Sequence, residues 1–390
     1  MFDLKQIRSA WVEIDLDNLA NNIQEVRRLT KPGVKIAAVI KANGYGHGAV
    51  KIAPILLENG AEVIAVAILD EAIELREAGF KVPIFVLGYT DPSRASEIIE
   101  YDIEQTVFSI DLAKALSDEA IKQGKKAKVH IKIDTGMGRI GFLPNHLVID
   151  KIKEIISLPS IVFEGLFTHF ASADESDKAY TIQQFEKFER VLYQLEKEGI
   201  KPNVRHVANS ATIIDLPTMH LDMVRPGIML YGLLPSREVI LQNVNLKQVM
   251  TLKTKITNVK EISKGDSVGY SRKFVARGKT VIASLPIGYA DGLFRSLSNI
   301  AEALVHGKRV PVVGKICMDQ CMIDVTGIDD VKVGDEVVLF GSQGEEMIHI
   351  DELADAIGTI NYEIVCAINR RVPRVYIKDG KIVDYVNYLL

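Results

Sequence analysis

Short apolar segments alternate with longer amphipathic ones between about residues 35 and 225. The short segments are rich in β-branched residues and have the length of buried parallel strands, whereas the longer segments have the spacing of surface helices. Several helical segments end at a glycine, at residues 60, 79, 124 and 199, as helices often do. We expect strands at residues 35–40, 63–66, 84–86, 105–108, 128–133, 161–166, 204–207 and 221–224.

This alternation predicts an α/β fold, an N-terminal (β/α)8 TIM-type barrel. A doubly wound open sheet is the alternative, and it is disfavoured because no G-x-G-x-x-G motif follows the first strand. From about residue 245 the apolar stretches are shorter and broken by Gly and Pro. That texture predicts a mainly antiparallel β domain with one helix near Ile350–Ile357. We therefore expect a barrel domain at residues 1–245 and a β-rich C-terminal domain at residues 246–390.

The composition is that of a globular protein, with 390 residues, 47% hydrophobic and 25% charged. Lys and Arg number 47 against 51 Asp and Glu, which gives no support to nucleic-acid or membrane-surface binding. The N-terminal sequence MFDLKQIRSAWVEIDLDN has charges where a signal peptide is apolar. Three cysteines, Cys317, Cys321 and Cys366, form neither a disulfide framework nor a paired zinc motif. We expect a cytoplasmic protein without a metal site.

Polar and charged residues follow the predicted barrel strands, at the ends where barrel enzymes have their active sites. They are Lys41 after the first strand, Arg139 after the fifth, His169 after the sixth, Asn209 and Ser210 after the seventh, and Arg225 and Gly227 after the eighth. Chance placement would not put so many of them at strand ends. The sequence therefore predicts an active site at this end of the barrel.

Lys41 lies in KANGYGHG, directly after an apolar strand. An isolated lysine there would ordinarily be a solvated side chain, but the glycines let backbone approach a ligand, and a desolvated lysine can bond covalently to an aldehyde. Ser210 and the backbone N–H groups of Gly227 and Ile228 lie where barrels bind phosphate, although helix capping and turn formation would also explain them. Together these features favour pyridoxal 5′-phosphate (PLP), with Arg225 near its pyridine nitrogen.

Two further segments have competing interpretations. KIDTGMGRIG lacks the spacing of a nucleotide-binding P-loop and reads by itself as a tight turn, yet Arg139 within it suits a carboxylate or phenolate. Lys132, His169 and His206 could instead form a metal site with a carbamylated lysine, as in amidohydrolase-like hydrolases. That alternative lacks an H-x-H pair and a clear aspartate after the eighth strand.

The motifs KANGYGHG, KIDTGMGRIG, THFASAD, RPGIMLYG, SVGYS, PIGYADG, CMDQ and NYE follow one another in this order between about Trp11 and Tyr376. By this ordered set the chain resembles the alanine racemase family. The resemblance implies a PLP-dependent racemase that interconverts L-alanine and D-alanine and supplies D-alanine for peptidoglycan. It also implies a homodimer in which the C-terminal domain completes the partner's active site.

The resemblance assigns roles to individual residues. Lys41 matches the lysine that holds PLP and acts as one base, and Tyr270 matches the second base, supplied by the partner subunit. Arg139 and the backbone of Met318 match the groups that receive the substrate carboxylate. The cofactor-binding positions are Tyr45, His169 behind the ring, Asn209, Ser210, Arg225, Gly227, Ile228 and Tyr362. The remaining matches are Lys132, carbamylated in some members, and the entrance residues Asp174, Tyr289, Arg295 and Ile360.

Two positions depart from the family pattern: Gly44, where alanine is more frequent, and Lys315, where many relatives have arginine near the entrance.

Racemisation favours two acid–base groups on opposite faces of the substrate. The reference pKa values of Lys and Tyr are ~10.4 and ~10, and both have to fall for these groups to act near neutral pH. The alternatives are a PLP-dependent decarboxylase, a racemase of broader specificity for small amino acids, and a non-catalytic PLP carrier. CMDQ in place of a cysteine–aspartate motif argues against the first, and the β domain argues against the last.

Overall fold

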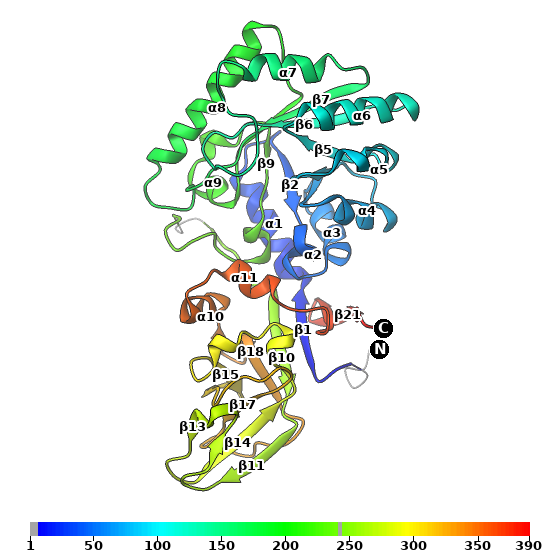
Figure 1. Ribbon diagram of the computed structural model, residues 1–390. Coiled ribbons are helices and arrows are strands. Elements are labelled where there is room, and N and C mark those ends of the chain that lie inside the picture. Colours follow the sequence, from blue (N-terminus) through cyan, green and yellow to red (C-terminus); the bar gives the residue numbers. More distant parts are fainter. Residues whose placement is uncertain (1–6, 241–243) are drawn as a thin grey trace. The chain divides into compact units, whose positions relative to one another are not determined.

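The computed structural model describes residues 7–240 and 244–390 (Figure 1). The first six residues of the charged N-terminal sequence lie outside the described residues. The chain divides into two compact units, which we call the barrel unit (Leu19–Gly44 and Ala49–Lys247) and the β unit (Met1–Asn18, Tyr45–Gly48 and Gln248–Leu390). A single boundary after residue 245 does not reproduce this division, because two N-terminal segments group with the C-terminal residues.

The barrel unit contains all eight predicted parallel strands, within one or two residues of the expected bounds. Each strand pairs in parallel with its neighbour, in the order β8-β7-β6-β5-β4-β3-β2-β9. β8 and β9, the two ends of this order, are not paired with each other as strands. The residues that follow them are joined by a hydrogen bond, in which Arg225 N donates to Ala208 O at 2.9 Å. The strands are β2 (Lys35–Val39), β3 (Val63–Val66), β4 (Ile84–Val86), β5 (Glu104–Val107), β6 (Ala127–Lys132), β7 (Ile161–Phe167), β8 (Val204–His206) and β9 (Met223–Val224). The predicted (β/α)8 barrel is confirmed.

Helices cover the outside of these strands (Figure 1). They are α1 (Leu16–Leu29), α3 (Ala49–Glu58), α4 (Leu69–Glu77), α5 (Ala95–Glu100), α6 (Ile110–Lys122), α7 (Val148–Ile156), α8 (Ala179–Lys197) and α9 (Ser210–Asp215). The predicted glycine stops are confirmed: Gly79, Gly124 and Gly199 follow the C-caps of α4, α6 and α8 with positive φ. No helix within the described ranges is long and apolar enough to cross a membrane.

The β unit is built on a sheet with the order β16-β15-β18-β10-β1-β20-β21, in which β19 also pairs with β18. Its strands are β1 (Ala10–Asp15), β10 (Met250–Lys255), β15 (Glu302–Val305), β16 (Lys308–Pro311), β18 (Glu336–Gln343), β19 (Glu346–Ile348), β20 (Arg374–Lys378) and β21 (Lys381–Val386). Smaller sheets pair β11 (Asn258–Ile262), β14 (Thr280–Leu285) and β17 (Cys321–Asp324), and β12 (Ser267–Val268) with β13 (Phe274–Val275).

Among the described residues of the β unit, α10 (Ile350–Ile357) and α11 (Asn361–Cys366) are helical, and α10 has the predicted bounds. The N-terminal strand β1 was not predicted. It pairs antiparallel with β10 and parallel with β20, and four of its six side chains are buried, including Trp11 at 2% exposure. Its apolar pattern is short, and nothing nearby in the sequence identifies partners more than two hundred residues away.

Candidate active site

Lys41 begins a strained turn directly after β2. The segment Lys41–Tyr45 (α2) contains Ala42, Asn43 and Gly44 with φ values of 53°, 53° and 63°, which is left-handed backbone. This conformation costs roughly 1–2 kcal/mol per non-glycine residue. Hydrogen bonds hold it: Ala42 N donates to Glu71 Oε1 at 2.5 Å, and Ala49 N donates to Asn43 Oδ1 at 2.9 Å. The fold therefore fixes the backbone that carries Lys41.

Ser210 and Gly227 meet where the sequence predicted a phosphate site. Gly227 N donates to Ser210 Oγ at 3.0 Å, and both residues are buried, as is Ile228 at the start of the 3-10 turn η4 (Ile228–Tyr231). Asn209 caps α9, since its Oδ1 accepts from Thr212 N at 3.0 Å. Asn209, rather than Ser210, is thus the capping residue, and the Ser210 hydroxyl and the Gly227 N–H form one small polar cradle.

Arg225 is a buried cation whose hydrogen-bond acceptors are neutral. It donates through Nη1 to His206 Nδ1 at 2.8 Å and through Nη2 to Thr168 O at 2.9 Å and Val207 O at 3.2 Å. Its Nη2 lies 3.5 Å from Nδ1 of His169. Burial and the nearby Arg139 lower the pKa of Arg225 to about 9. Desolvation, aided by Arg225, holds the pKa of His169 well below its usual value, so this histidine is neutral near pH 7.

Lys132 lies in the same region, 3% exposed at the end of β6, with Nζ 5.4 Å from the centre of the Phe167 ring. Desolvation, together with the positive charges of Arg139, Arg225 and Lys41, lowers the pKa of Lys132 to about 7, and Asp134 partly opposes this shift. Because these cations destabilise one another's charge, the end of the barrel favours bound anions. A phosphate and an amino-acid carboxylate would supply them, so these residues fit PLP and its substrate.

Arg139 is exposed and belongs to a tight turn, as the plainer interpretation of its motif held. Asp134 Oδ1 accepts from the backbone N of Gly136 and Gly138, each at 3.0 Å. Gly141 admits no side chain, because a Cβ there would lie 2.7 Å from Asp134 N. The tight turn does not exclude a role in binding an anion. The Arg139 guanidinium is near enough to Lys132 and Arg225 for its charge to lower the pKa of both.

Among the described residues, no group of three or more His, Cys, Asp or Glu side chains has a metal-binding arrangement. The rival metal interpretation also loses His206, whose two ring nitrogens contact Arg225 and His130. Asp174, an expected entrance residue, is half-buried and accepts through its backbone O from the Ser236 hydroxyl.

The other glycines of KANGYGHG belong to the β unit, where they allow close packing. A Cβ on Gly46 would lie 2.4 Å from Val365 O, and one on Gly48 would lie 2.0 Å from Tyr376 Oη. The neighbouring Tyr45 is buried, with its ring centre 6.1 Å from that of Tyr362. Two predicted cofactor-binding tyrosines, distant in sequence, are therefore neighbours within this unit.

The remaining predicted site residues of the β unit are exposed. Tyr270 is 68% exposed, Met318 53%, Tyr289 42% and Ile360 60%, and Arg295 is also exposed. Tyr270 begins the turn η6 (Tyr270–Arg272), directly after Gly269 with φ 71°. Tyr289 and Met318 lie on adjoining segments, because Tyr289 N donates to Cys317 O at 3.0 Å, and their exposed side chains make this a candidate binding surface.

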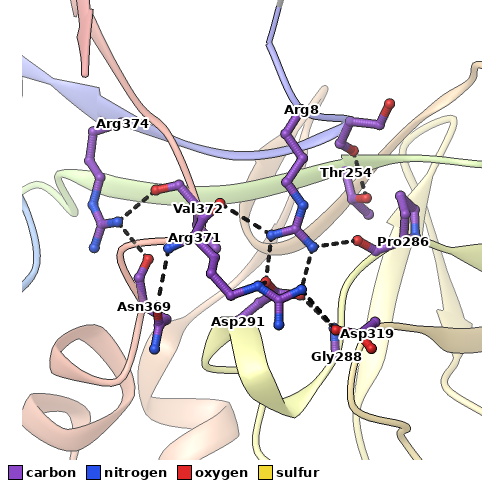
Figure 2. A network of polar contacts seen from close by, with 11 residues as sticks. Arg8, Thr254, Pro286, Gly288, Asp291, Asp319, Asn369, Arg371, Val372 and Arg374 are labelled. Carbon is purple, nitrogen blue, oxygen red and sulfur yellow. Dashed lines mark hydrogen bonds and ion pairs between the residues drawn. The ribbon is translucent and has the colours of Figure 1, made fainter. Parts of the chain in front are cut away.

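A buried carboxylate organises part of this surface (Figure 2). Asp291 is fully buried; Arg8 donates to its two oxygens at 2.5 and 2.8 Å, and Gly288 N donates to Oδ2 at 3.1 Å. The same turn bonds to the Met318 segment, because Ala290 N donates to Met318 O at 3.0 Å. Arg371 contacts both Asp291 (3.5 Å) and Asp319 (2.8 Å). Sequence reasoning missed Asp291, although an aspartate within PIGYADG was the available signal.

Sequence profiles of known families match nearly the whole chain. The profile described as "Alanine racemase, N-terminal domain" matches residues 14–235, and "Alanine racemase, C-terminal domain" matches residues 249–376. Alanine racemase 1 of Clostridium acetobutylicum is 50% identical over 385 residues, which cover 99% of this chain and 100% of the relative.

The chain belongs to the alanine racemase family.

Solved structures of the family agree. Alanine racemase of Clostridium difficile 630 has a TM-score of 0.95 and 43% identity, covering 98% of this chain and 100% of that one. The Bacillus anthracis alanine racemase with bound L-Ala-P has a TM-score of 0.92 and 40% identity, covering 98% of each chain. A histidine racemase of Leuconostoc mesenteroides is similar at 31% identity with a TM-score of 0.88, covering 96% of this chain and 99% of that one. The family's enzymes are isomerases.

Proposed function

We propose that this chain is a PLP-dependent alanine racemase that acts in the cytoplasm and supplies D-alanine for peptidoglycan. The observation that carries the proposal is the group of cations at the carboxyl end of the barrel, next to the Ser210–Gly227 cradle. Arg225 donates there to neutral acceptors, and Lys132 is buried among positive neighbours. Such a site is suited to a ligand with a phosphate and to a substrate with a carboxylate.

Each residue then has a definite task. Lys41 holds the cofactor and moves a proton at its Nζ, and Tyr270 of the partner subunit moves a proton at its Oη on the opposite face. Ser210, Gly227, Ile228, Tyr45 and Tyr362 bind the phosphate, and His169 packs behind the ring. When bound, PLP supplies an electron-withdrawing ring that stabilises negative charge at the substrate α-carbon.

Arg225 sets the reaction type. Its pKa of about 9 is still well above that of a pyridine nitrogen, so it donates a hydrogen bond without giving up its proton. Arg225 would thereby keep the pyridine nitrogen unprotonated, which would favour return of the proton to the substrate α-carbon over transamination. Arg139 and the backbone of Met318 receive the substrate carboxylate. Asp174, Tyr289, Arg295 and Ile360 line the entrance.

Lys132 is suited to carbamylation. With a pKa of about 7, Lys132 is an uncharged amine in roughly half of the molecules near neutral pH. The uncharged amine is the form that reacts with CO2. The carbamate would replace a buried cation by an anion among Arg139, Arg225 and Lys41. This exchange relieves the repulsion from these three cations, which adds to desolvation in lowering the pKa of Lys132.

A homodimer would cover the exposed residues of the β unit. Tyr270, Met318, Tyr289 and Ile360 are between 42% and 68% exposed in one chain. In a two-fold symmetric dimer each chain presents the same surface to the other, so the exposed residues of both chains would be covered. No feature of the described residues favours the decarboxylase alternative, and a broader substrate range is a question for the same assay.

The experiment is incubation of the PLP-loaded protein with L-alanine in deuterated water. We expect D-alanine to form and deuterium to enter the α-position of both enantiomers, with no ethylamine. Ethylamine without D-alanine would establish a decarboxylase instead. Serine and histidine in parallel reactions measure the substrate range, and an inactive protein with bound PLP would overturn the proposal.

A further inference from the structure

A row of four ionisable side chains crosses the barrel interior and ends at Arg225. Glu104 Oε2 lies 3.0 Å from His130 Nε2, His130 Nδ1 lies 2.9 Å from His206 Nε2, and His206 Nδ1 lies 2.8 Å from Arg225 Nη1. Their exposures are 6%, 1%, 0% and 4%. They stand on β5, β6, β8 and directly after β9, so four strands contribute to one line of contacts.

The protons in this row can be assigned from its arginine end. Arg225 can only donate, so His206 Nδ1 accepts and the ring proton of a neutral His206 is on Nε2. That N–H donates to His130 Nδ1, which puts the His130 proton on Nε2, facing the Glu104 carboxylate. Burial and Arg225 hold the pKa of His206 well below its usual value, in agreement with a neutral ring. Every contact then has one donor and one acceptor, and all bonds point from Arg225 to Glu104.

The barrel is shaped around the two histidines. Gly165 on β7 faces His130, and a Cβ there would lie 2.0 Å from His130 Nδ1. The pairing of β6 with β7 shifts register between Val129 and His130. The ring centres of Phe85 and His130 lie 4.0 Å apart. The Phe167 and His206 rings are stacked, with their centres 4.8 Å apart and their planes at 5° to each other. These ring contacts hold both imidazoles in place.

We propose that Glu104 is a positioning residue for the reaction: through His130 and His206 it fixes the tautomers that hold Arg225 in place, charged and donating. The inference rests on the proposed function, in which Arg225 faces the cofactor's pyridine nitrogen. Hydrogen bonds in a buried chain polarise one another, so an anion at one end supports a cation at the other. Without an acceptor at Glu104, the His130 N–H would be buried and unsatisfied.

The consequence of losing that acceptor follows from the direction of the row. His130 would move its proton to Nδ1, and His206 would then have to accept at Nε2 and carry its own proton on Nδ1. The proton on Nδ1 would face the Arg225 N–H, donor against donor, and displace the guanidinium. Glu104→Gln retains an acceptor oxygen and so preserves the direction, whereas Glu104→Met removes the acceptor at similar size.

The first test uses 15N NMR of the histidine rings in the protein without PLP. Wild type should show His130 and His206 as Nε2–H tautomers with slowly exchanging ring protons, and Glu104→Gln should keep this pattern. Glu104→Met should show Nδ1–H signals or rapid exchange at both rings. The matched control is Thr106→Val, also buried on β5 two residues along, which removes one hydrogen bond to Val86 O. Unchanged tautomers in a folded Glu104→Met protein would reject the relay.

The second test measures the ratio of racemisation to transamination in the PLP-loaded proteins. Glu104→Met should lower this ratio by about tenfold or more, the effect of losing one hydrogen bond to a charged group. Glu104→Gln should recover most of it, and Thr106→Val should match wild type. If Glu104→Met keeps the wild-type ratio, Glu104 has only a structural role. A wild-type protein that fails to racemise would instead refute the proposed function, while the NMR result would still decide the tautomers.

Discussion

The predicted site residues fall into two groups, those of the barrel unit (the barrel half) and those of the β unit (the β half), and the groups differ in how far one chain buries them. In the barrel unit, Arg225, Ser210 and Lys132 are buried and their surroundings are specified by hydrogen bonds and aromatic contacts. In the β unit, Tyr270 and Met318 are more than half exposed, although Asp291 fixes the backbone near Met318. The barrel half is therefore organised for a ligand within one chain. The predicted site residues of the β half stay exposed in one chain, which is what the proposed homodimer requires.

The largest expected effect belongs to the barrel half. Lys41→Ala should abolish covalent PLP binding and lower racemisation by about 10³-fold or more, the scale of losing a principal catalytic group. Borohydride reduction and peptide mapping of wild type should place the pyridoxyl group on Lys41. Lys51→Ala, an exposed lysine on α3, is the control and should keep full activity. A pyridoxyl label on another lysine would contradict the site.

The next effect tests whether the β half serves the other chain. Lys41→Ala and Tyr270→Phe proteins, each nearly inactive, are mixed, dissociated and reassociated. If Tyr270 acts across the dimer, one site of each hybrid has both changes and the other has neither. Random pairing gives about half hybrids, so roughly a quarter of wild-type activity should return. No recovery, despite subunit exchange shown by mass-tagged chains, would place Tyr270 in its own chain's site.

A smaller effect concerns stability of the β half. Asp291→Asn leaves Arg8 without its buried carboxylate and should lower the free energy of unfolding by about 2–3 kcal/mol, somewhat less than for a fully buried pair because Arg8 is partly exposed. Asp319→Asn breaks an exposed contact with Arg371 and should cost about 0–1 kcal/mol. Urea unfolding measures both. Equal effects would mean that burial of Asp291 does not matter.

The smallest effect is a pH dependence in the barrel half. The folded-state pKa of Lys132 is lowered to about 7, whereas the unfolded chain keeps its ordinary value near 10.5. Between these values the unfolded state binds more protons, so stability rises with pH from about 7 to 10. Lys132→Met should remove this rise, measured by urea unfolding across that pH range in bicarbonate-free buffer. Parallel curves for wild type and variant would show that Lys132 is charged throughout.

Sequence patterns predicted the barrel well because its strands are consecutive and each carries its own apolar signal. They also predicted that Lys41, Ser210 and Arg225 follow the carboxyl ends of barrel strands, and these residues come just after β2, β8 and β9. They did not predict β1, whose partners are distant, nor the row from Glu104 to His206. Those polar residues lie within strand patterns and look like tolerated exceptions, and only the closed barrel brings them together.

The central position of β1 has a consequence for synthesis. This strand is made first, but its partners β10 and β20 begin about 235 and 360 residues later. At ~5–20 residues per second, a ribosome needs about 12–50 seconds to reach β10. Throughout that time the apolar edge of β1 is unpaired, while the consecutive strands of the barrel can associate as they emerge. The nascent chain is therefore exposed to aggregation through its first strand, and chaperone contacts with newly made protein should concentrate on residues 10–15.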